Sequence, residues 1–204
     1  MIVENDKKLL MVMAHPDDEI IFGWPILQNK QIKKELLICS NDSRNPERQW
    51  CSKRSEALFN LCNALEIPCT CLDNNSQFYK TNARTGELVK TYKEIIDVIT
   101  AHKPYYIFTH NPLGEYGMLD HIMVHNIVMS YSPAFLVITD IFQQNIWAYQ
   151  DTISDKYKLV YYKNYIGAET LDLAFYNYCK QFYTKLNVWT WSKNPITLCN
   201  LYLV

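Results

Sequence analysis

Histidine and carboxylate side chains cluster near the start of the chain. In the stretch 11-MVMAHPDDEIIFG-23, an apolar run breaks off into a histidine, a proline and three consecutive acidic residues before apolar residues resume. Adjacent negative charges repel one another, so a positive partner is expected to compensate for them. His15 and Asp18 lie three residues apart across the turn, and a neutral imidazole with a carboxylate suits a divalent cation such as Zn²⁺. Because a catalytic zinc usually takes three protein ligands, a third ligand should come from elsewhere.

Two histidines in the second half of the chain could supply the third ligand. His121 opens a predicted helix directly behind the polar loop 114–121, and His125 follows one helical turn later on about the same face. An i, i+4 pair of histidines can itself chelate a metal, so the spacing alone leaves both as candidates. The plainer alternative for residues 15–19 is a polar turn that caps a helix, since Asp is common at helix starts.

The elements that must position these residues alternate between strand and helix. Apolar runs predict strands over residues 8–14, 36–41, 68–73, 105–111, 134–142 and 158–163. Three- and four-residue apolar spacing and helix-start signals predict helices over residues 18–28, 46–65, 92–102, 121–131 and 168–186, with a hairpin-like excursion over 81–91.

This alternation predicts an α/β fold that is Rossmann-like, with a mainly parallel sheet and helices on both faces. Such folds bind ligands at the carboxyl ends of their strands. The two polar clusters, 15–19 and 110–121, each follow a predicted strand. We therefore expect them to meet in one cleft although about a hundred residues separate them.

Length and composition predict one domain over residues 1–204, with 49% hydrophobic and 20% charged residues as in ordinary globular proteins. A net charge of −1 gives no basic face for nucleic acid. No apolar run reaches the roughly 18 residues of a membrane span, and the first residues lack a signal-peptide core. We therefore expect a cytoplasmic protein whose seven cysteines are reduced thiols. The sequence is compatible with both a monomer and a homo-oligomer.

Two motifs and a weaker third resemble the LmbE/PIG-L family of zinc-dependent N-deacetylases. AHPDDE (14–19) follows the first predicted strand, and GMLDH (117–121) precedes a predicted helix. RSEA (54–57) is similar to the family's Arg-x-Glu-Ala stretch, although it is a poor signal by itself. The predicted order of elements fits the LmbE-like fold from about residue 8 to residue 190.

The resemblance implies a role for each matching residue. His15, Asp18 and His121 would be the zinc ligands, and His125 falls outside the family's ligand pattern. Asp17 would be the general base for a zinc-bound water that attacks an amide carbonyl, which agrees with carboxylate chemistry. The implied enzyme is a hydrolase that removes an acetyl group from a small-molecule N-acetylated amino sugar or a glycoconjugate.

One position departs from the family pattern. The family often has a His three residues before the last ligand, in a G-H-P-D-H pattern, and here Met118 occupies that position. Met can neither stabilise an oxyanion by hydrogen bonding nor protonate a leaving amine. Zinc alone, His110, Tyr116 or a substrate group is left to fill the role. The alternative is a catalytically weakened or inactive sugar-binding member of the same fold.

Several side chains are candidates for substrate contact: Arg44, Arg54, His110, Tyr116 and Met118. Arg44 follows the second predicted strand, so it could bind a hydroxyl or a phosphate, and a solvated Arg is the usual alternative. For Arg54 an exposed helical face is equally compatible with the sequence, and for His110 a structural hydrogen bond is favoured over catalysis. A nucleotide-dependent oxidoreductase would suit the fold, but G-x-G-x-x-G does not follow the first strand.

Overall fold

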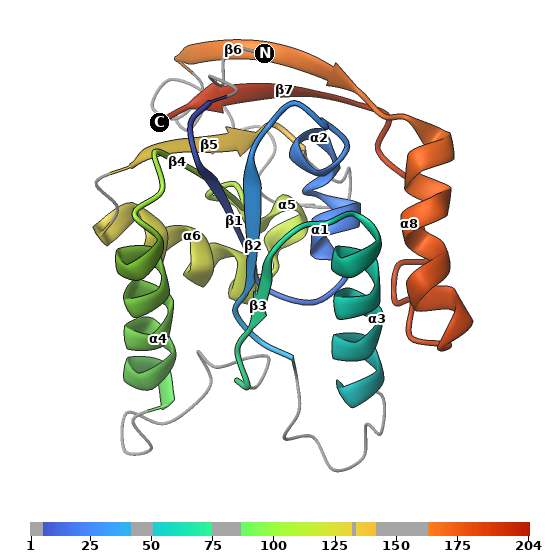
Figure 1. Ribbon diagram of the computed structural model, residues 1–204. Coiled ribbons are helices and arrows are strands. Elements are labelled where there is room, and N and C mark those ends of the chain that lie inside the picture. Colours follow the sequence, from blue (N-terminus) through green and yellow to red (C-terminus); the bar gives the residue numbers. More distant parts are fainter. Residues whose placement is uncertain (1–5, 42–50, 75–86, 132–133, 142–162) are drawn as a thin grey trace.

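The computed structural model describes residues 6–41, 51–74, 87–131, 134–141 and 163–204. These residues form a seven-stranded sheet in the order β3-β2-β1-β4-β5-β7-β6 (Figure 1). The strands are β1 (Leu9–Met13), β2 (Lys34–Ile38), β3 (Cys69–Cys71), β4 (Tyr106–Thr109), β5 (Phe135–Thr139), β6 (Asn164–Thr170) and β7 (Leu198–Leu203). The first five strands pair in parallel, whereas β7 pairs antiparallel with both β5 and β6.

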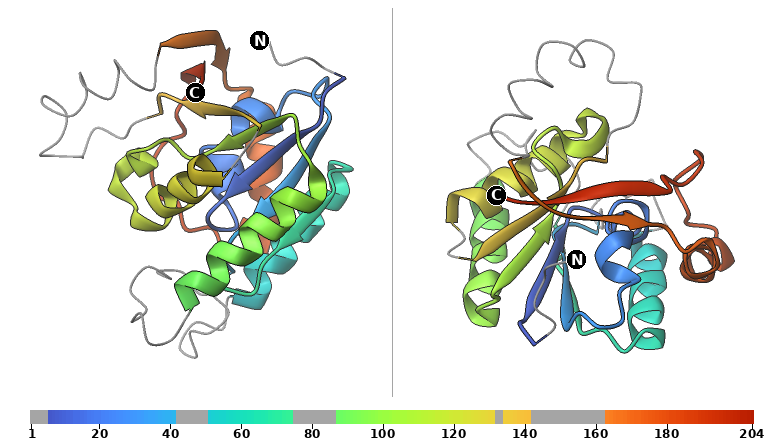
Figure 2. Two further views of the ribbon diagram at one scale, coloured as in Figure 1. Left: turned by 90° about the vertical axis from the view of Figure 1, so that its left-hand side faces the viewer. Right: turned by 90° about the horizontal axis from the view of Figure 1, so that it is seen from above.

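Helices cover both faces of the sheet. They are α1 (Asp18–Ile21), α2 (Trp24–Leu27), α3 (Cys51–Ala64), α4 (Glu87–His102), α5 (Gly114–Gly117), α6 (Leu119–Tyr131) and α8 (Leu173–Lys185). Figures 1 and 2 show α3 and α8 on one side of the sheet and α4 and α6 on the other. Among the described residues, no helix is both long enough and apolar enough to cross a membrane. The predicted α/β architecture, with a mainly parallel sheet, is confirmed.

The central strand β1 explains why the sequence around it is continuously apolar. All five of its residues are buried. Met11 belongs to the core cluster under α1, α3 and α8, whereas Val12 belongs to the cluster under α4 and α6. A parallel strand that is covered on both faces requires apolar side chains in every position rather than in alternate ones.

The parallel pairing of β1 with β4 brings the two polar clusters together. Val12 is opposite Thr109, so the segments that follow both strands leave the sheet at the same edge. The backbone N–H of Ala14 donates to His110 Nε2 at 3.0 Å, which links the two segments directly. The expected convergence of residues 15–19 with 110–121 is therefore confirmed.

The helix predicted over residues 18–28 is wrong as a single element, because it is broken between α1 and α2. Gly23 lies at the break, where a Cβ atom would come within 2.8 Å of the Glu19 carbonyl oxygen and of Met11 Cε. Pro25 then occupies the first turn of α2, where a residue without an N–H is tolerated. The chain thus turns sharply here instead of continuing one helix.

The C-terminal elements also differ from the prediction. Residues 164–170 form β6, so the helix expected from residue 168 begins only at Leu173 in α8. The strand β7 was not predicted, and it gives the sheet an antiparallel edge. All but the last residue of the strand expected over 158–163, and most of the hairpin expected over 81–91, lie outside the described residues, and residues 87–91 are helical within α4.

Candidate functional site

Asp18 lies at the centre of a buried group of imidazole rings. Its Oδ2 atom is 3.3 Å from His15 Nδ1, 3.3 Å from His121 Nε2 and 3.6 Å from His110 Nε2. The backbone N–H of His15 also donates to Asp18 Oδ2, at 2.8 Å. Burial alone would raise the pKa of Asp18, but His121 and His15 outweigh it and hold that pKa well below its usual value. Asp18 is therefore an anionic group that faces three nitrogen-bearing rings.

Asp120 orients the ring of His15. The Nε2 atom of His15 lies 2.9 Å from Asp120 Oδ2, and an ionised carboxylate can only accept a hydrogen bond. The His15 proton in a neutral ring is thus on Nε2, which leaves the lone pair of Nδ1 on the side of Asp18. A carboxylate behind an imidazole in this way is a recurring feature of metal sites.

Glu115 orients the ring of His121 in the same manner. Glu115 Oε2 lies 2.7 Å from His121 Nδ1, which therefore carries the donated proton. Burial alone would raise the pKa of Glu115, but His110 and His121 outweigh it and lower that pKa to about 2. Within the described part of the chain, the buried Nε2 of His121 has no hydrogen-bond partner. Burial alone would lower the pKa of His121, but Asp18 and Glu115 outweigh it and raise that pKa to about 10. A metal ion bound between Nε2 and Asp18 would take the place of this proton.

The backbone of Glu115 is unusual for a residue with a side chain, because its φ angle is 57°. Asn111 holds it in place: Glu115 N donates to Asn111 Oδ1 at 3.2 Å, and Asn111 N donates to Glu115 Oε1 at 2.9 Å. A residue keeps such a backbone conformation only where several surrounding contacts hold it there. Residues of this kind are concentrated at functional sites. Glu115 was not among the residues singled out from the sequence.

The donor atoms of His15, Asp18 and His121 fit a divalent metal. They lie within 4.8 Å of one another and consist of two imidazole nitrogens and one carboxylate oxygen, which is a set that zinc takes in catalytic sites. His110, Glu115 and His121 form a second compact group. That group fits poorly, because His110 Nε2 already accepts from the Ala14 N–H and its Nδ1 lies 3.0 Å from Glu115 Oε2.

His125 and His110 form hydrogen bonds that hold the loops around this group. His125 Nδ1 lies 2.8 Å from the His110 carbonyl oxygen, and burial lowers the pKa of His125 to about 4. Neutral His125 therefore donates to the loop that carries His110. Both ring nitrogens of His110 are used in hydrogen bonds, in agreement with the structural role favoured from the sequence.

Asp17 lies beside the candidate metal ligands His15, Asp18 and His121 without being part of that group. Its Oδ1 atom is 2.8 Å from Nη2 of Arg54, and its Oδ2 atom accepts from the Thr190 hydroxyl at 2.6 Å. Burial raises the pKa of Asp17, while Arg54 opposes that rise. A carboxylate whose pKa is raised is better suited to accept a proton and give it back.

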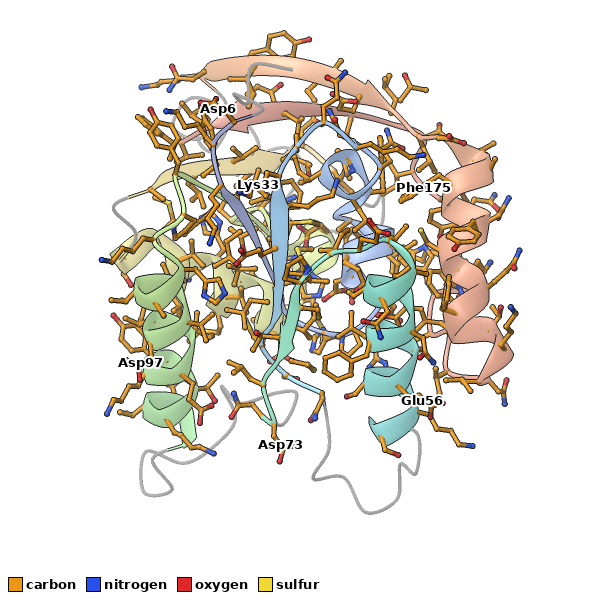
Figure 3. All side chains as sticks on the ribbon, viewed as in Figure 1. Asp6, Lys33, Glu56, Asp73, Asp97 and Phe175 are labelled. Carbon is orange, nitrogen blue, oxygen red and sulfur yellow. The ribbon has the colours of Figure 1, made fainter. Side chains whose placement is uncertain are left out.

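The remaining sequence candidates are placed differently. Arg54 is buried and also donates to the Pro16 carbonyl oxygen, so the exposed-face interpretation of Arg54 is wrong. Glu56, two positions further along α3, is exposed (Figure 3). Arg44 lies outside the described residues. Met118, at the C-terminal end of α5, is half-buried.

Aromatic side chains border the group. The ring of Tyr116 is 5.5 Å from that of His121, 5.9 Å from that of Phe22 and 5.8 Å from that of Trp191. Tyr116 is 37% exposed, so it lies between the buried rings and solvent. Phe22 and Trp191 were not singled out from the sequence, and no spacing rule connects them with His121.

Comparison with known proteins agrees with this geometry. The family model described as PIG-L: GlcNAc-PI de-N-acetylase matches residues 10–132. An uncharacterized protein, L374, of Acanthamoeba polyphaga mimivirus is 25% identical over 133 residues, which is 61% of this chain and 57% of the viral protein. The chain thus spans little more than half the length of that relative.

Solved structures share the whole fold at low identity. The A40926 pseudoaglycone deacetylase Dbv21 superposes with a TM-score of 0.62 at 10% identity, over 98% of this chain and 97% of that one. The hydratase GalB of Pseudomonas putida, which acts on 4-carboxy-2-hydroxymuconate, gives a TM-score of 0.53 at 12% identity, over 97% and 96% of the two chains. The fold therefore supports more than one reaction, and the family match carries the assignment: the chain belongs to the PIG-L/LmbE family of de-N-acetylases.

Proposed function

We propose that this protein is a zinc-dependent hydrolase that removes an acetyl group from an N-acetylated amino sugar, free or within a glycoconjugate. The observation that carries the proposal is the arrangement of His15, Asp18 and His121, with Asp17 directly beside them. The orientation of the two rings by Asp120 and Glu115 supports it, because each ring turns its other nitrogen towards Asp18. Family membership supports the reaction class.

The roles of the side chains follow from their hydrogen bonds. His15, Asp18 and His121 would hold the zinc ion, which when bound acts as a Lewis acid that lowers the pKa of water and polarises a carbonyl. Asp17 accepts a proton from the water that attacks the amide carbon, and returns it to the nitrogen of the amino sugar as the carbon–nitrogen bond breaks. The products are acetate and the free amine, so one water is consumed for each amide.

The oxyanion needs a donor that Met118 cannot provide. Of the other candidates, His110 has both ring nitrogens in use and is 1% exposed, whereas Tyr116 keeps a partly exposed ring next to His121. We therefore assign to the Tyr116 hydroxyl, rather than to His110, the hydrogen bond to the developing charge.

Replacing Met118 with His is expected to raise the rate of deacetylation. A histidine at this position would add an acid next to the oxyanion, and a positioned acid contributes about 10²-fold or more to such reactions. We expect kcat to rise by at least about tenfold, since Tyr116 already supplies part of the effect. Met129→His, at an exposed position of α6, is the matched control. An unchanged kcat would show that the acid position is already filled.

Replacing Glu115 with Gln is expected to weaken zinc binding. Gln offers one acceptor oxygen, whereas Glu115 accepts from the Nδ1 atoms of both His110 and His121 through Oε2 and from Asn111 N through Oε1. Loss of such an orienting partner costs about 10- to 100-fold in metal affinity. Competition with a chromophoric chelator measures it, with the exposed Glu56→Gln as control. Equal affinities would contradict the orienting role.

Met118 also favours a second candidate, a sugar-binding protein of the same fold with little or no turnover. Acetate release from N-acetylglucosamine and its glycoconjugates, with zinc content determined in parallel, separates the two. Because GalB shows that the fold also hosts a hydratase, acetate itself must be measured rather than loss of substrate. Zinc-dependent acetate release that a chelator abolishes supports the enzyme; stoichiometric zinc without acetate from any acetylated sugar favours the binding protein.

A further inference from the structure

The C-terminal part of the chain reaches Asp17 from outside the stretch that the family model matches. Thr190 follows α8, and its Oγ1 lies 2.6 Å from Asp17 Oδ2. The family match ends at residue 132, so no role for this residue comes with the family. Because an ionised carboxylate can only accept, the Thr190 hydroxyl must donate this hydrogen bond.

The two oxygens of the Asp17 carboxylate accept hydrogen bonds from residues that are far apart in the sequence. Arg54, on α3, donates to Oδ1, and Thr190 donates to Oδ2. With a donor on each oxygen, rotation of the carboxylate about its Cβ–Cγ bond would break at least one hydrogen bond. One donor alone would leave that rotation less restricted, so Thr190 determines where the free lone pairs of Asp17 point.

The backbone of Asp17 is also held by the C-terminal helix. Asp17 has a φ angle of 96°, a conformation that residues with side chains rarely adopt. Its N–H donates to Glu19 Oε2 at 2.9 Å, and Glu19 Oε1 accepts from the Tyr183 hydroxyl of α8 at 2.6 Å. Glu19 and Tyr183 are fully buried, so this chain of hydrogen bonds is shielded from water.

The segment that carries Thr190 is itself fixed. Trp189 Nε1 donates to the Trp191 carbonyl oxygen at 2.6 Å, and the Trp189 ring packs edge-on against Tyr183 with centroids 6.1 Å apart. The N–H of Val188 donates to the Tyr183 carbonyl oxygen at 3.0 Å. Thr190 therefore lies in a segment that these contacts hold in place, as a residue that positions another group must.

We propose that Thr190 is a positioning residue that, together with Arg54, aims the carboxylate of Asp17 at the attacking water. This inference rests on the proposed function, since it assigns Thr190 to the same reaction. It predicts an effect on turnover without an effect on zinc binding, because Thr190 is separated from the zinc-binding group by Asp17. It also predicts that a hydroxyl, rather than the threonine methyl group, is what position 190 requires.

The test compares Thr190→Val, which replaces the hydroxyl with a methyl group, and Thr190→Ser, which keeps the hydroxyl. We expect Thr190→Val to lower kcat by about 10- to 100-fold with KM within about twofold. Thr190→Ser should restore kcat to within about threefold of the unmodified protein. Zinc stoichiometry should stay equal in all three proteins, and a crystal structure of Thr190→Val should show the Asp17 carboxylate rotated. Thr184→Val, at an exposed hydroxyl of α8 that donates to the Gln181 carbonyl oxygen, is the control.

The outcomes separate this inference from the proposed function. An unchanged kcat in Thr190→Val, or a fall in kcat that Thr190→Ser does not reverse, would overturn the role of Thr190 and leave the proposed function intact. Loss of zinc in Thr190→Val would likewise overturn it in favour of a structural role. If Thr190→Val does not fold, Thr190→Ala removes the hydroxyl without adding a methyl group, and the same expectations apply. Absence of acetate release from the unmodified protein would overturn both proposals.

Discussion

Asp18→Asn is expected to lose zinc and acetate release together. Asp18 Oδ2 is the atom that faces both His15 and His121, and an amide is a far poorer ligand than a carboxylate for zinc. Since loss of a mere orienting partner costs about 10- to 100-fold in affinity, loss of a ligand should weaken zinc binding by more than about 100-fold. Metal analysis after dialysis against a weak chelator measures the effect.

The control for Asp18→Asn is Asp97→Asn. Asp97 is exposed on α4 (Figure 3), whereas the imidazole rings are buried, so the same change of charge should leave zinc and kcat unaltered there. Thermal unfolding of both variants without zinc establishes that they fold. A folded Asp18→Asn protein that keeps stoichiometric, tightly bound zinc would show that the metal lies elsewhere.

Asp17→Asn is expected to keep zinc and lose turnover. Asn is of nearly the same size as Asp but cannot accept a proton from the attacking water, and general base catalysis contributes about 10²- to 10⁴-fold. We therefore expect kcat to fall by about 10²-fold or more while KM changes little. Single-turnover acetate release with zinc content measured on the same sample is the appropriate experiment.

Two results would contradict the role of Asp17. A kcat that stays within about threefold of the unmodified protein would mean that another group accepts the proton. Loss of zinc from Asp17→Asn would instead identify Asp17 as a ligand. The two variants thus distinguish the adjacent carboxylates, because Asp18→Asn should lose zinc whereas Asp17→Asn should keep it. Both variants remove one negative charge, so charge alone predicts no difference in zinc content between them.

The sequence predicted the convergence of the site because that convergence depends on local patterns and one topological rule. The strand β1 is apolar throughout since both its faces are covered, and β4 is likewise buried at every position, with Thr109 as its one polar residue. Parallel neighbours end at the same edge of a sheet, so His15 and His121 come within 5.5 Å, ring to ring, although 106 positions separate them. This prediction required only local sequence patterns and the rule for parallel strands, and no individual long-range contact.

The supporting residues could not be predicted in this way. Glu115 reaches His121 through an uncommon φ angle, and Thr190 reaches Asp17 across 173 positions of sequence. Neither contact follows from helical or strand periodicity. For Arg54 the sequence was equally compatible with an exposed helical face and with substrate contact, and its burial against Asp17 follows from neither. The antiparallel strand β7 was not predicted for a similar reason, because it pairs with β5, which is distant from it in the sequence.

The position of the metal tests the central claim most directly. Crystals grown with one equivalent of zinc, with data collected on both sides of the zinc absorption edge, locate the ion by its anomalous signal. We predict one peak within bonding distance of His15 Nδ1, Asp18 Oδ2 and His121 Nε2, with Asp17 close by but not bonded to it. A peak between His110, Glu115 and His121, or no peak near Asp18, would contradict the account.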